Sequence, residues 1–321
     1  MTATSAVQSS GHPAAEAWRR LRPDEAVAHI EDLKGSSKAT NGIGKRLVSR
    51  LRIGTTGSAV IAKYGRSKSM FVEQAVYSKL LGVPAVRTAT YLGSILDEPD
   101  PGSCWIFLCD VGGIEPTRWS QALRRDLASW LGCLHSSCQT MAPDVGLSIR
   151  LEDALGFRIS SIAAKAATTD RRPVFDALLE ALRAWERAWT GIQPIAALLP
   201  ETLTHGDIAM KNMRVVQNAR SSQLVVFDWG KAAWTSPLAD LVNVDLQRYR
   251  AAVLEFGLKL SVHDLLRCSA SGRFLRYVAA IDWQMASWPH HWSEGSEDNL
   301  FEHLAGAVRA LNLVQAASHH A

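Results

Sequence analysis

The chain has 321 residues, of which 47% are hydrophobic and 21% charged, a balance typical of globular proteins and not of disordered chains. This length usually exceeds what one hydrophobic core holds, so we expect two lobes or domains. No apolar run reaches the length of about 20 residues that a membrane-spanning helix needs. The start, MTATSAVQSSGHPAAEAW, lacks a basic stretch followed by an apolar one, so we expect no secretory signal and a flexible tail over residues 1–20.

The cysteine spacing and the net charge indicate the redox compartment of the protein and the kind of partner it binds. The five cysteines are an odd number, and the pairs Cys104/Cys109 and Cys133/Cys138 lack the CxxC spacing of zinc and redox sites. We therefore expect a reduced, cytoplasmic protein. The net charge of +4 is mild and the Lys and Arg residues are scattered, which suits an anionic small molecule at least as well as a nucleic acid. We expect no nucleic-acid or membrane partner, and a monomer or homodimer.

The first third of the chain predicts an antiparallel sheet followed by a helix. Extended segments at residues 28–33, 45–53 and 59–64 are separated by Gly, Ser, Thr and Asn. The loop between the first two, KGSSKATNGIG, can wrap phosphate oxygens with backbone N–H groups, although a plain surface hairpin is the more common explanation. Residues 67–84 predict one helix.

That helix carries a carboxylate on its apolar stripe. Glu73 is followed by Val76, Tyr77 and Leu80, which is the spacing of one helix face. Because burying an unpaired charge is costly, Glu73 needs a partner. We predict that Lys63, ten positions earlier at the end of a strand, supplies it. A surface ion pair without a catalytic role is the alternative.

Beyond residue 113 the sequence is mainly helical. A last strand at residues 103–109 is followed by DVGG, after which apolar residues recur at three-to-four spacing. The predicted helices cover residues 120–135, 175–192, 240–258, 274–288 and 300–316. We therefore predict an α+β fold with two lobes. These are an N-lobe with a small antiparallel sheet (21–108), a hinge (109–113) and a larger, mainly helical C-lobe (114–321).

Two short motifs place three oxygen-bearing side chains near one hairpin. If the extended segments 212–216 and 223–227 pair, Asn212 and Asp228 lie at the same end, with Asp207 in the loop before the first strand. Phosphoryl transfer from a nucleotide needs magnesium on hard oxygen ligands, a carboxylate at the attacking hydroxyl and a cation on the phosphates. HGDIAMKN and FDWG can supply the oxygens. Ordinary polar turns at two strand ends are the alternative.

The ordered set Lys63, Glu73, LASWLGCLH, HGDIAMKN and FDWGKAAWTSPLADL resembles the aminoglycoside phosphotransferase and choline kinase families, small-molecule kinases with a protein-kinase-like fold. The resemblance implies ATP as cofactor, with GTP as the alternative, and Mg²⁺. It implies that Asp207 is the catalytic base or orients the hydroxyl, and that Asn212 and Asp228 bind the metal. The twelve positions between Asp228 and Asp240 leave no room for a protein-kinase activation segment.

The same resemblance implies further roles. Lys63 contacts the phosphates, Glu73 fixes Lys63, and the backbone from Cys109 to Val111 receives the adenine. The loop residues expected over the phosphates are Gly35, Ser36, Ser37 and Asn41. His205 is expected to brace the catalytic loop, and Asp240 to hold that loop from behind.

The acceptor is the part that the motifs constrain least. The candidate acceptor residues are Lys211, Trp283, Trp288, Trp292 and Asp298. Core packing is the alternative for the tryptophans, and plain solvation for Lys211. The basic chain favours a neutral, nucleoside-like or sugar-like acceptor over a polycation, which needs an acidic cleft. The resemblance implies phosphorylation of an antibiotic hydroxyl, in resistance or self-protection. A choline, amino-alcohol or sugar kinase, or a catalytically silent nucleotide-binding module, are the alternatives.

Overall fold

The computed structural model describes the chain except for residues 1–5, 8–10, 34–46, 55–56, 67, 81–82, 84–85, 98–101, 140, 142–145, 168–172, 218–220, 287–294 and 319–321. It divides into two compact units. The first consists of Met1–Arg118 and Ala209–Ala232, and the second of Trp119–Ile208 and Ala233–Ala321. Six of the predicted site residues lie outside the described residues: Gly35, Ser36, Ser37, Asn41, Trp288 and Trp292.

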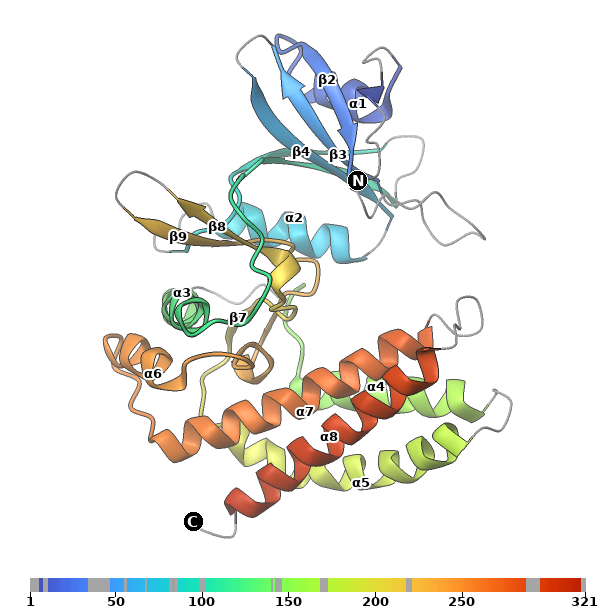
Figure 1. The fold of residues 1–321 in the computed structure, drawn as a ribbon, viewed down its shortest axis with the longest axis vertical. Coiled ribbons are helices and arrows are strands. Elements are labelled where there is room, and N and C mark those ends of the chain that lie inside the picture. Colours follow the sequence, from blue (N-terminus) through green and yellow to red (C-terminus); the bar gives the residue numbers. More distant parts are fainter. Residues whose placement is uncertain are drawn as a thin grey trace. The chain divides into compact units, whose positions relative to one another are not determined.

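The first unit is built on a six-stranded sheet with the strand order β1-β2-β3-β4-β6-β5 (Figure 1). Every neighbouring pair is antiparallel, which confirms the predicted N-lobe sheet. The strands are β1 (Ala6–Val7), β2 (Val27–Asp32), β3 (Leu47–Ile53), β4 (Ser58–Gly65), β5 (Tyr91–Leu96) and β6 (Cys104–Cys109). In the register of β3 and β4, Val48 pairs with Lys63 and Arg50 pairs with Ile61. Lys63, the lysine of the predicted site, therefore lies near the end of β4 and opposite the start of β3.

Helix α1 (Pro13–Leu21) packs on this sheet, so the prediction of a flexible tail over residues 1–20 is wrong for its second half. Trp18 is 2% exposed, and its ring lies edge-on to Phe107 at a centroid distance of 5.2 Å. The other buried side chains of the helix are Ala14, Ala15 and Ala17. One tryptophan among alanines buries enough apolar surface to dock a short helix, although it makes no conspicuous stripe in the sequence.

Helix α2 (Lys68–Leu80) follows β4 and contacts β5 and β6. Val76 and Tyr77 are buried, and the Tyr77 ring stacks on Tyr91 with centroids 6.0 Å apart. Glu73 lies on the same face and is 1% exposed. The predicted stripe is therefore the buried face of the helix, and the carboxylate within it is buried as well.

The hairpin of β8 (Met213–Gln217) and β9 (Ser222–Val226) also belongs to the first unit, although the chain has by then passed through residues 119–208 of the second. Met213 pairs with Val226, and just beyond this pair the Phe227 N–H donates to the Asn212 carbonyl at 3.0 Å. The predicted pairing is thereby confirmed. The units consequently differ from the expected lobes, because residues 209–232 group with the sheet.

The second unit is mainly helical, as predicted. Its helices are α3 (Gln121–Gln139), α4 (Leu151–Ala167), α5 (Pro173–Ala196), α6 (Leu246–Leu254), α7 (Val262–Ala286) and α8 (Ser296–Ser318). Helices α4, α5, α7 and α8 pack together (Figure 1). A short pair of antiparallel strands, β7 (Thr202–Thr204) and β10 (Ala233–Thr235), lies before and after residues 205–232, and the 3₁₀ turn η2 (Pro237–Asp240) follows.

Helix α4 was not predicted from the sequence, and two further helices differ most from their predicted bounds. The apolar spacing over residues 240–258 predicts one helix, but α6 covers only Leu246–Leu254. Asn243 has a φ of +61°, which interrupts a right-handed helix, and the Asp245 carboxylate caps the start of α6 by accepting the Arg248 N–H at 3.0 Å. Helix α7 begins at Val262, well before the predicted residue 274.

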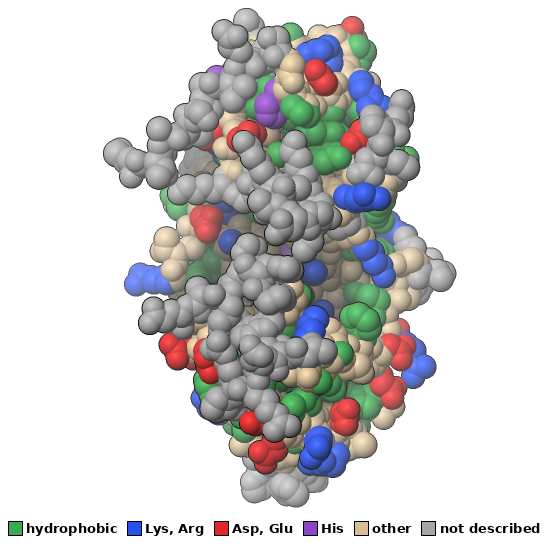
Figure 2. Space-filling model, turned by 90° about the vertical axis from the view of Figure 1, so that its right-hand side faces the viewer, with side chains coloured by type: hydrophobic (Ala, Val, Ile, Leu, Met, Phe, Trp, Pro, Cys, Tyr) green, Lys and Arg blue, Asp and Glu red, His purple; other side chains and the backbone are tan. Residues whose placement is uncertain are grey.

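The face drawn in Figure 2 shows no concentration of one charge among the described side chains. On the face seen in Figure 2, described Lys and Arg side chains are interspersed with Asp and Glu. None of the described helices combines the length and apolarity needed to cross a bilayer. All five cysteines are free thiols. Burial raises the pKa of Cys104 to about 11, which keeps this thiol protonated at neutral pH.

Candidate active site

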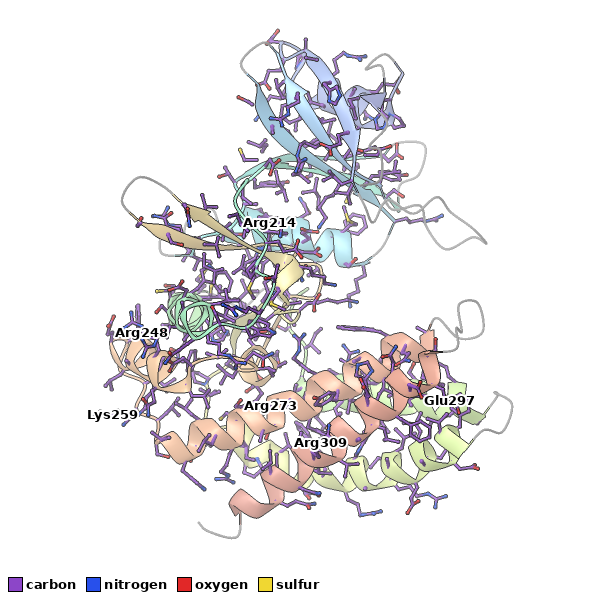
Figure 3. All side chains as sticks on the ribbon, in the orientation of Figure 1. Arg214, Arg248, Lys259, Arg273, Glu297 and Arg309 are labelled. Carbon is purple, nitrogen blue, oxygen red and sulfur yellow. The ribbon has the colours of Figure 1, made fainter. Side chains whose placement is uncertain are left out.

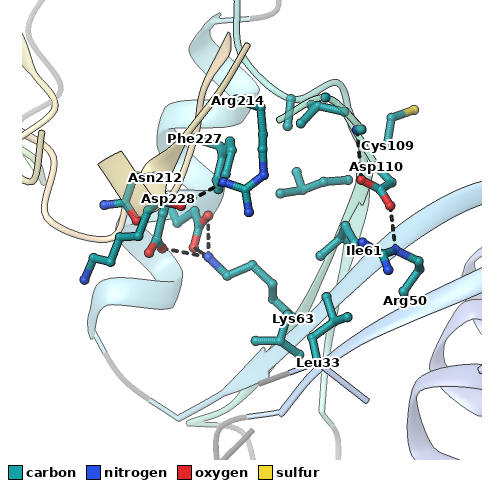
Figure 4. Close-up of a pocket in the computed structure, with 18 residues that line it drawn as sticks. Leu33, Arg50, Ile61, Lys63, Cys109, Asp110, Asn212, Arg214, Phe227 and Asp228 are labelled. Atoms are coloured by element: carbon teal, nitrogen blue, oxygen red, sulfur yellow. Dashed lines mark hydrogen bonds and ion pairs between the residues drawn. The ribbon is translucent and has the colours of Figure 1, made fainter. Parts of the chain in front are cut away.

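A cavity of about 330 Å³ lies within the first unit (Figure 4). Residues of the sheet, the segment after β6 and the end of the β8–β9 hairpin line it. Its apolar lining includes Val48, Ile61, Ala89, Leu108 and Phe227. Its polar lining includes Lys63, Glu73, Lys211, Asn212 and Asp228. The cavity thus pairs an apolar wall with a cluster of charges, which is the usual composition of a small-molecule site.

Lys63 is the centre of that cluster. Its Nζ lies 2.7 and 2.6 Å from the two carboxylate oxygens of Glu73 and 2.8 Å from Oδ1 of Asp228. Burial alone would lower the pKa of Lys63, but the charges of the two carboxylates outweigh burial and raise it. Lys63 is therefore a buried, fully charged cation. The predicted pair with Glu73 is confirmed, and the third partner, Asp228, is an addition to it.

Asp228 has an unusual backbone. Its φ is +72°, in the left-handed region that costs a non-glycine residue about 1 kcal/mol or more. The neighbouring residue Trp229 is fully buried and its Nε1 donates to Thr88 at 3.0 Å, while the Thr88 hydroxyl donates to the Val226 carbonyl at 2.7 Å. These contacts on both sides fix the turn and direct the Asp228 carboxylate into the cavity.

Asn212 completes a set of hard oxygen donors. It is 3% exposed, it lines the same cavity as Asp228, and their chain segments are joined by the bond from Phe227 to the Asn212 carbonyl. A carboxylate and an amide oxygen from two adjacent segments suit Mg²⁺, which takes one or two protein oxygens and fills its remaining positions with phosphate oxygens and water. The residues present therefore fit the predicted metal.

The predicted hinge differs in detail from the expectation that residues 109–111 all receive a base. The Cys109 N–H donates to Thr90, and the Asp110 N–H donates to Ala59, both at 2.9 Å. Among the described residues no hydrogen-bond partner is found for the Val111 N–H, and Val111 lines the cavity. Of the three backbone N–H groups in residues 109–111, only that of Val111 is available to donate a hydrogen bond to a nucleotide base. The Asp110 side chain is occupied too, since it accepts from Arg50 at 2.6 Å.

Arg214 lines the cavity and was not predicted. Its guanidinium lies over the Phe227 ring at 5.2 Å from the centroid, and Nη2 lies 3.2 Å from Glu115. Nη1 donates to the carbonyls of Lys211 and Met213 at 3.2 and 2.6 Å. Its position two residues after Asn212, in a mainly apolar strand, is the sequence feature from which this role could have been predicted.

In the second unit, Asp240 holds the loop that carries Asp207. The fully buried Asp240 carboxylate accepts the N–H groups of His205 and Gly206 at 2.7 and 2.9 Å, and it lies 3.4 Å from His135 Nε2. Burial acts to raise the pKa of Asp240, but its interactions with His135 and His205 outweigh burial and lower it. The predicted anchoring role of Asp240 is confirmed.

His205 braces the same loop from within. It is 0% exposed, its ring meets Trp130 edge-on, and its Nδ1 accepts the Asp207 N–H at 3.3 Å. A buried ring held in this way positions the backbone of Asp207, in agreement with the bracing role predicted for it. The Asp207 side chain is 16% exposed, and its Oδ1 lies 3.6 Å from Nη2 of Arg276.

The described acceptor candidates lie on different elements. Lys211 lines the cavity of the first unit. Trp283 of α7 is 37% exposed and lies under the Arg158 guanidinium at 5.6 Å. Asp298 is exposed in the first turn of α8. Beside Trp283, the buried Asp282 carboxylate binds three groups of α4: the side chains of Arg158, Ser161 and Lys165.

Comparison with known proteins identifies the class. Residues 69–275 match the model of the phosphotransferase enzyme family, and because this match spans more than half of the chain, the chain belongs to that family. The match includes Glu73, Asp207, Asn212 and Asp228, whereas Lys63 precedes it. No curated protein sequence matches the chain significantly.

Solved structures of small-molecule kinases share the fold. A GDP complex of aminoglycoside 2'-phosphotransferase-IIIa is 13% identical, with 94% of this chain and 96% of that chain covered and a TM-score of 0.59. A microcompartment-associated aminopropanol kinase is 15% identical, with 88% and 94% covered and a TM-score of 0.61. A spectinomycin phosphotransferase in complex with ADP and spectinomycin is 11% identical, with 91% and 94% covered and a TM-score of 0.53. The predicted two-lobed, protein-kinase-like fold is confirmed.

Proposed function

We propose that the protein is a small-molecule kinase that transfers the γ-phosphoryl group of ATP or GTP to a hydroxyl group. The observation that carries this proposal is the placement of Lys63 between Glu73 and Asp228, at 2.6 and 2.8 Å, on the wall of a cavity in a member of a phosphotransferase family. A surface ion pair does not account for it, because Lys63 and Glu73 are 7% and 1% exposed.

The nucleotide is assigned to the cavity of the first unit. Its volume of about 330 Å³ and its apolar wall suit a purine base, and the Val111 N–H is available to the base edge. Lys63 supplies a cation for the phosphates. Asn212 and Asp228 would hold Mg²⁺, which neutralises phosphate charge when it is bound. Binding of the nucleotide then competes with Asp228 for the Lys63 ammonium.

Asp207 is assigned to the acceptor hydroxyl. The hydroxyl oxygen forms a bond to the γ-phosphorus, the bond to the β–γ bridging oxygen breaks, and the hydroxyl proton passes to the Asp207 carboxylate. The products are a phosphate ester and a nucleoside diphosphate. His205 and Asp240 fix the loop so that the carboxylate is oriented before the acceptor arrives.

The leading acceptor class is an antibiotic hydroxyl, phosphorylated in resistance or self-protection. The similarity to antibiotic phosphotransferases supports this class, and the net charge of +4 supports a neutral, nucleoside-like or sugar-like compound over a polycation. A metabolite kinase is the second candidate, because an aminopropanol kinase has the same fold.

The test is direct transfer. Purified protein is incubated with Mg²⁺, ATP or GTP, and a panel of hydroxylated antibiotics, amino alcohols and sugars, and products are examined by mass spectrometry for one added phosphoryl group. Asp228→Asn should abolish transfer, whereas Asp176→Asn on the exposed face of α5 should not. Nucleotide-induced thermal stabilisation without transfer to any acceptor or to water would favour a silent binding module instead.

A further inference from the structure

Arg276 of α7 is a cation beside Asp207, and the described residues supply no hydrogen-bond acceptor for it. Its Nη2 lies 3.6 Å from Asp207 Oδ1, which is too long for a hydrogen bond. Its Nη1 is buried and has no hydrogen-bond partner among the described residues. The side chain as a whole is 25% exposed. A guanidinium has five N–H donors, and leaving buried donors unpaired is costly.

Arg50 of the first unit shows what a satisfied arginine looks like in this protein. Its side chain is 29% exposed, close to the value for Arg276, yet Nε donates to Asp110 at 2.6 Å and Nη1 donates to Glu31 at 2.8 Å. Burial alone therefore does not explain the lack of partners at Arg276. An oxygen-bearing group that enters during function would complete its hydrogen bonds.

We propose that Arg276 is a specificity-determining residue that binds an anionic or strongly polarised oxygen of the acceptor, next to the hydroxyl engaged by Asp207. This inference rests on the proposed function and deepens it. A group that touches Asp207 lies next to the acceptor, because Asp207 receives the proton of the acceptor hydroxyl. The residues that we assign to the nucleotide phosphates and their metal are Lys63, Asn212 and Asp228, and all three belong to the first unit. Arg276 and Asp207 belong to the second unit.

The position of Arg276 defines the class of acceptor. A guanidinium beside the reacting hydroxyl repels an ammonium at that place and attracts a carboxylate, a phosphate or a carbonyl oxygen. Trp283 lies seven residues further along α7, on the same side of the helix and about 10 Å along its axis. This separation is close to the length of a nucleoside or of two linked sugars. The fitting acceptor is a hydroxyl compound of that size with a negatively polarised group near the hydroxyl.

The experiment uses acceptors matched in all but charge: a neutral sugar, the corresponding uronic acid and the corresponding amino sugar. The proteins are wild type, Arg276→Met, Arg276→Lys and the control Arg273→Met, a charge removal on an exposed part of the same helix (Figure 3). For each, kcat/KM with every acceptor and the rate of ATP hydrolysis without acceptor are measured, and thermal unfolding verifies folding.

Wild type should prefer the uronic acid to the amino sugar. Arg276→Met should lower that ratio about tenfold or more, chiefly through a higher KM for the acid, because a charge-assisted hydrogen bond is lost. Arg276→Lys should restore part of the ratio, and Arg273→Met should leave it unchanged.

Three results overturn the inference while the proposed function stands: a wild-type preference for the amino sugar, an unchanged ratio in Arg276→Met, or an equal fall in acceptor-independent hydrolysis. The last would assign Arg276 to the phosphoryl group itself. Wild type that neither hydrolyses ATP nor phosphorylates any acceptor would instead remove the proposed function, and the inference with it.

Discussion

The buried carboxylate of Asp240 accepts the backbone N–H of His205 at 2.7 Å, although 35 positions separate the two residues in the chain. The next N–H of the loop, that of Gly206, is held by the same carboxylate at 2.9 Å. Two adjacent donors bound by one carboxylate fix the direction of the peptide that leads into Asp207. The position of Asp207, and with it the role that we propose for this residue, thus depends on the buried side chain of Asp240.

Asp240→Asn tests this dependence. The substitution removes the charge and turns one acceptor into an NH₂ donor that faces backbone donors, so the free energy of unfolding should fall by about 2–4 kcal/mol. Turnover should fall by a larger factor than KM for the nucleotide changes. Urea denaturation and steady-state kinetics measure both, with Asp176→Asn as the control. Unchanged unfolding would contradict the anchoring role.

The same carboxylate predicts a pH dependence. Burial raises and the two histidines lower the pKa of Asp240, with a net fall below its ordinary value of 3.8, so the folded protein binds this proton less readily than the unfolded chain. Its contribution to stability is complete above about pH 5 and is lost as pH falls from there through the folded pKa. Urea denaturation from pH 6 downward should show this loss, and Asp240→Asn should show less of it. Parallel curves would contradict the prediction.

Lys63 and Glu73 should act as one unit. Lys63→Met and Glu73→Gln should each lower kcat/KM by about a hundredfold, and the double variant should lose far less than the product of the two. Thermal stabilisation by nucleotide should shrink in both. Lys68→Met, an exposed lysine at the start of α2, is the control. Independent, multiplicative losses would show that the pair does not position Lys63.

At position 228 we expect glycine to give a more stable protein than alanine, which is the reverse of the usual order of stability. Both Asp228→Ala and Asp228→Gly remove the carboxylate and should be inactive. Because the backbone φ is +72°, alanine carries the strain of the left-handed region and glycine does not. The glycine variant should be the more stable by about 1 kcal/mol, even after its larger unfolded-state entropy is counted. An alanine variant at least as stable would contradict the backbone argument.

Asp207→Asn should separate chemistry from nucleotide binding. Phosphoryl transfer should fall by about a thousandfold or more, because the hydroxyl loses both its base and its orientation. Nucleotide affinity, measured by calorimetry, should stay within about twofold, since Asp207 is not among the residues lining the cavity. Retention of more than about a tenth of wild-type turnover would remove Asp207 from its role.

Features set by short stretches of sequence could be predicted. The spacing of Lys63 and Glu73 needed only one strand, one turn and one helix. Asn212 and Asp228 came together because a hairpin fixes which residues share an end. In each case the contact follows from local geometry, so the residues that carry it are readable in order along the chain.

Features set by packing could not be predicted. Helix α1 is held by Trp18 against Phe107, a contact between residues far apart in the chain. The left-handed backbone of Asp228 is imposed by the buried neighbours of that turn, and nothing in the tetrapeptide FDWG requires it. Arg276 lies beside Asp207 because of the way α7 packs in the folded chain. The apolar periodicity of the sequence does not predict this contact.

The placement of residues 209–232 in the first unit has a consequence for how the protein is made. When the chain has been synthesised to Arg118, the sheet, α2 and the pair of Lys63 and Glu73 are all present, but the hairpin that carries Asp228 has not yet been translated. A nascent chain grows by about 5–20 residues per second, so the sheet is synthesised several seconds before the β8–β9 hairpin that lines the same cavity. The site that we propose for a metal–nucleotide complex is therefore completed only late in translation.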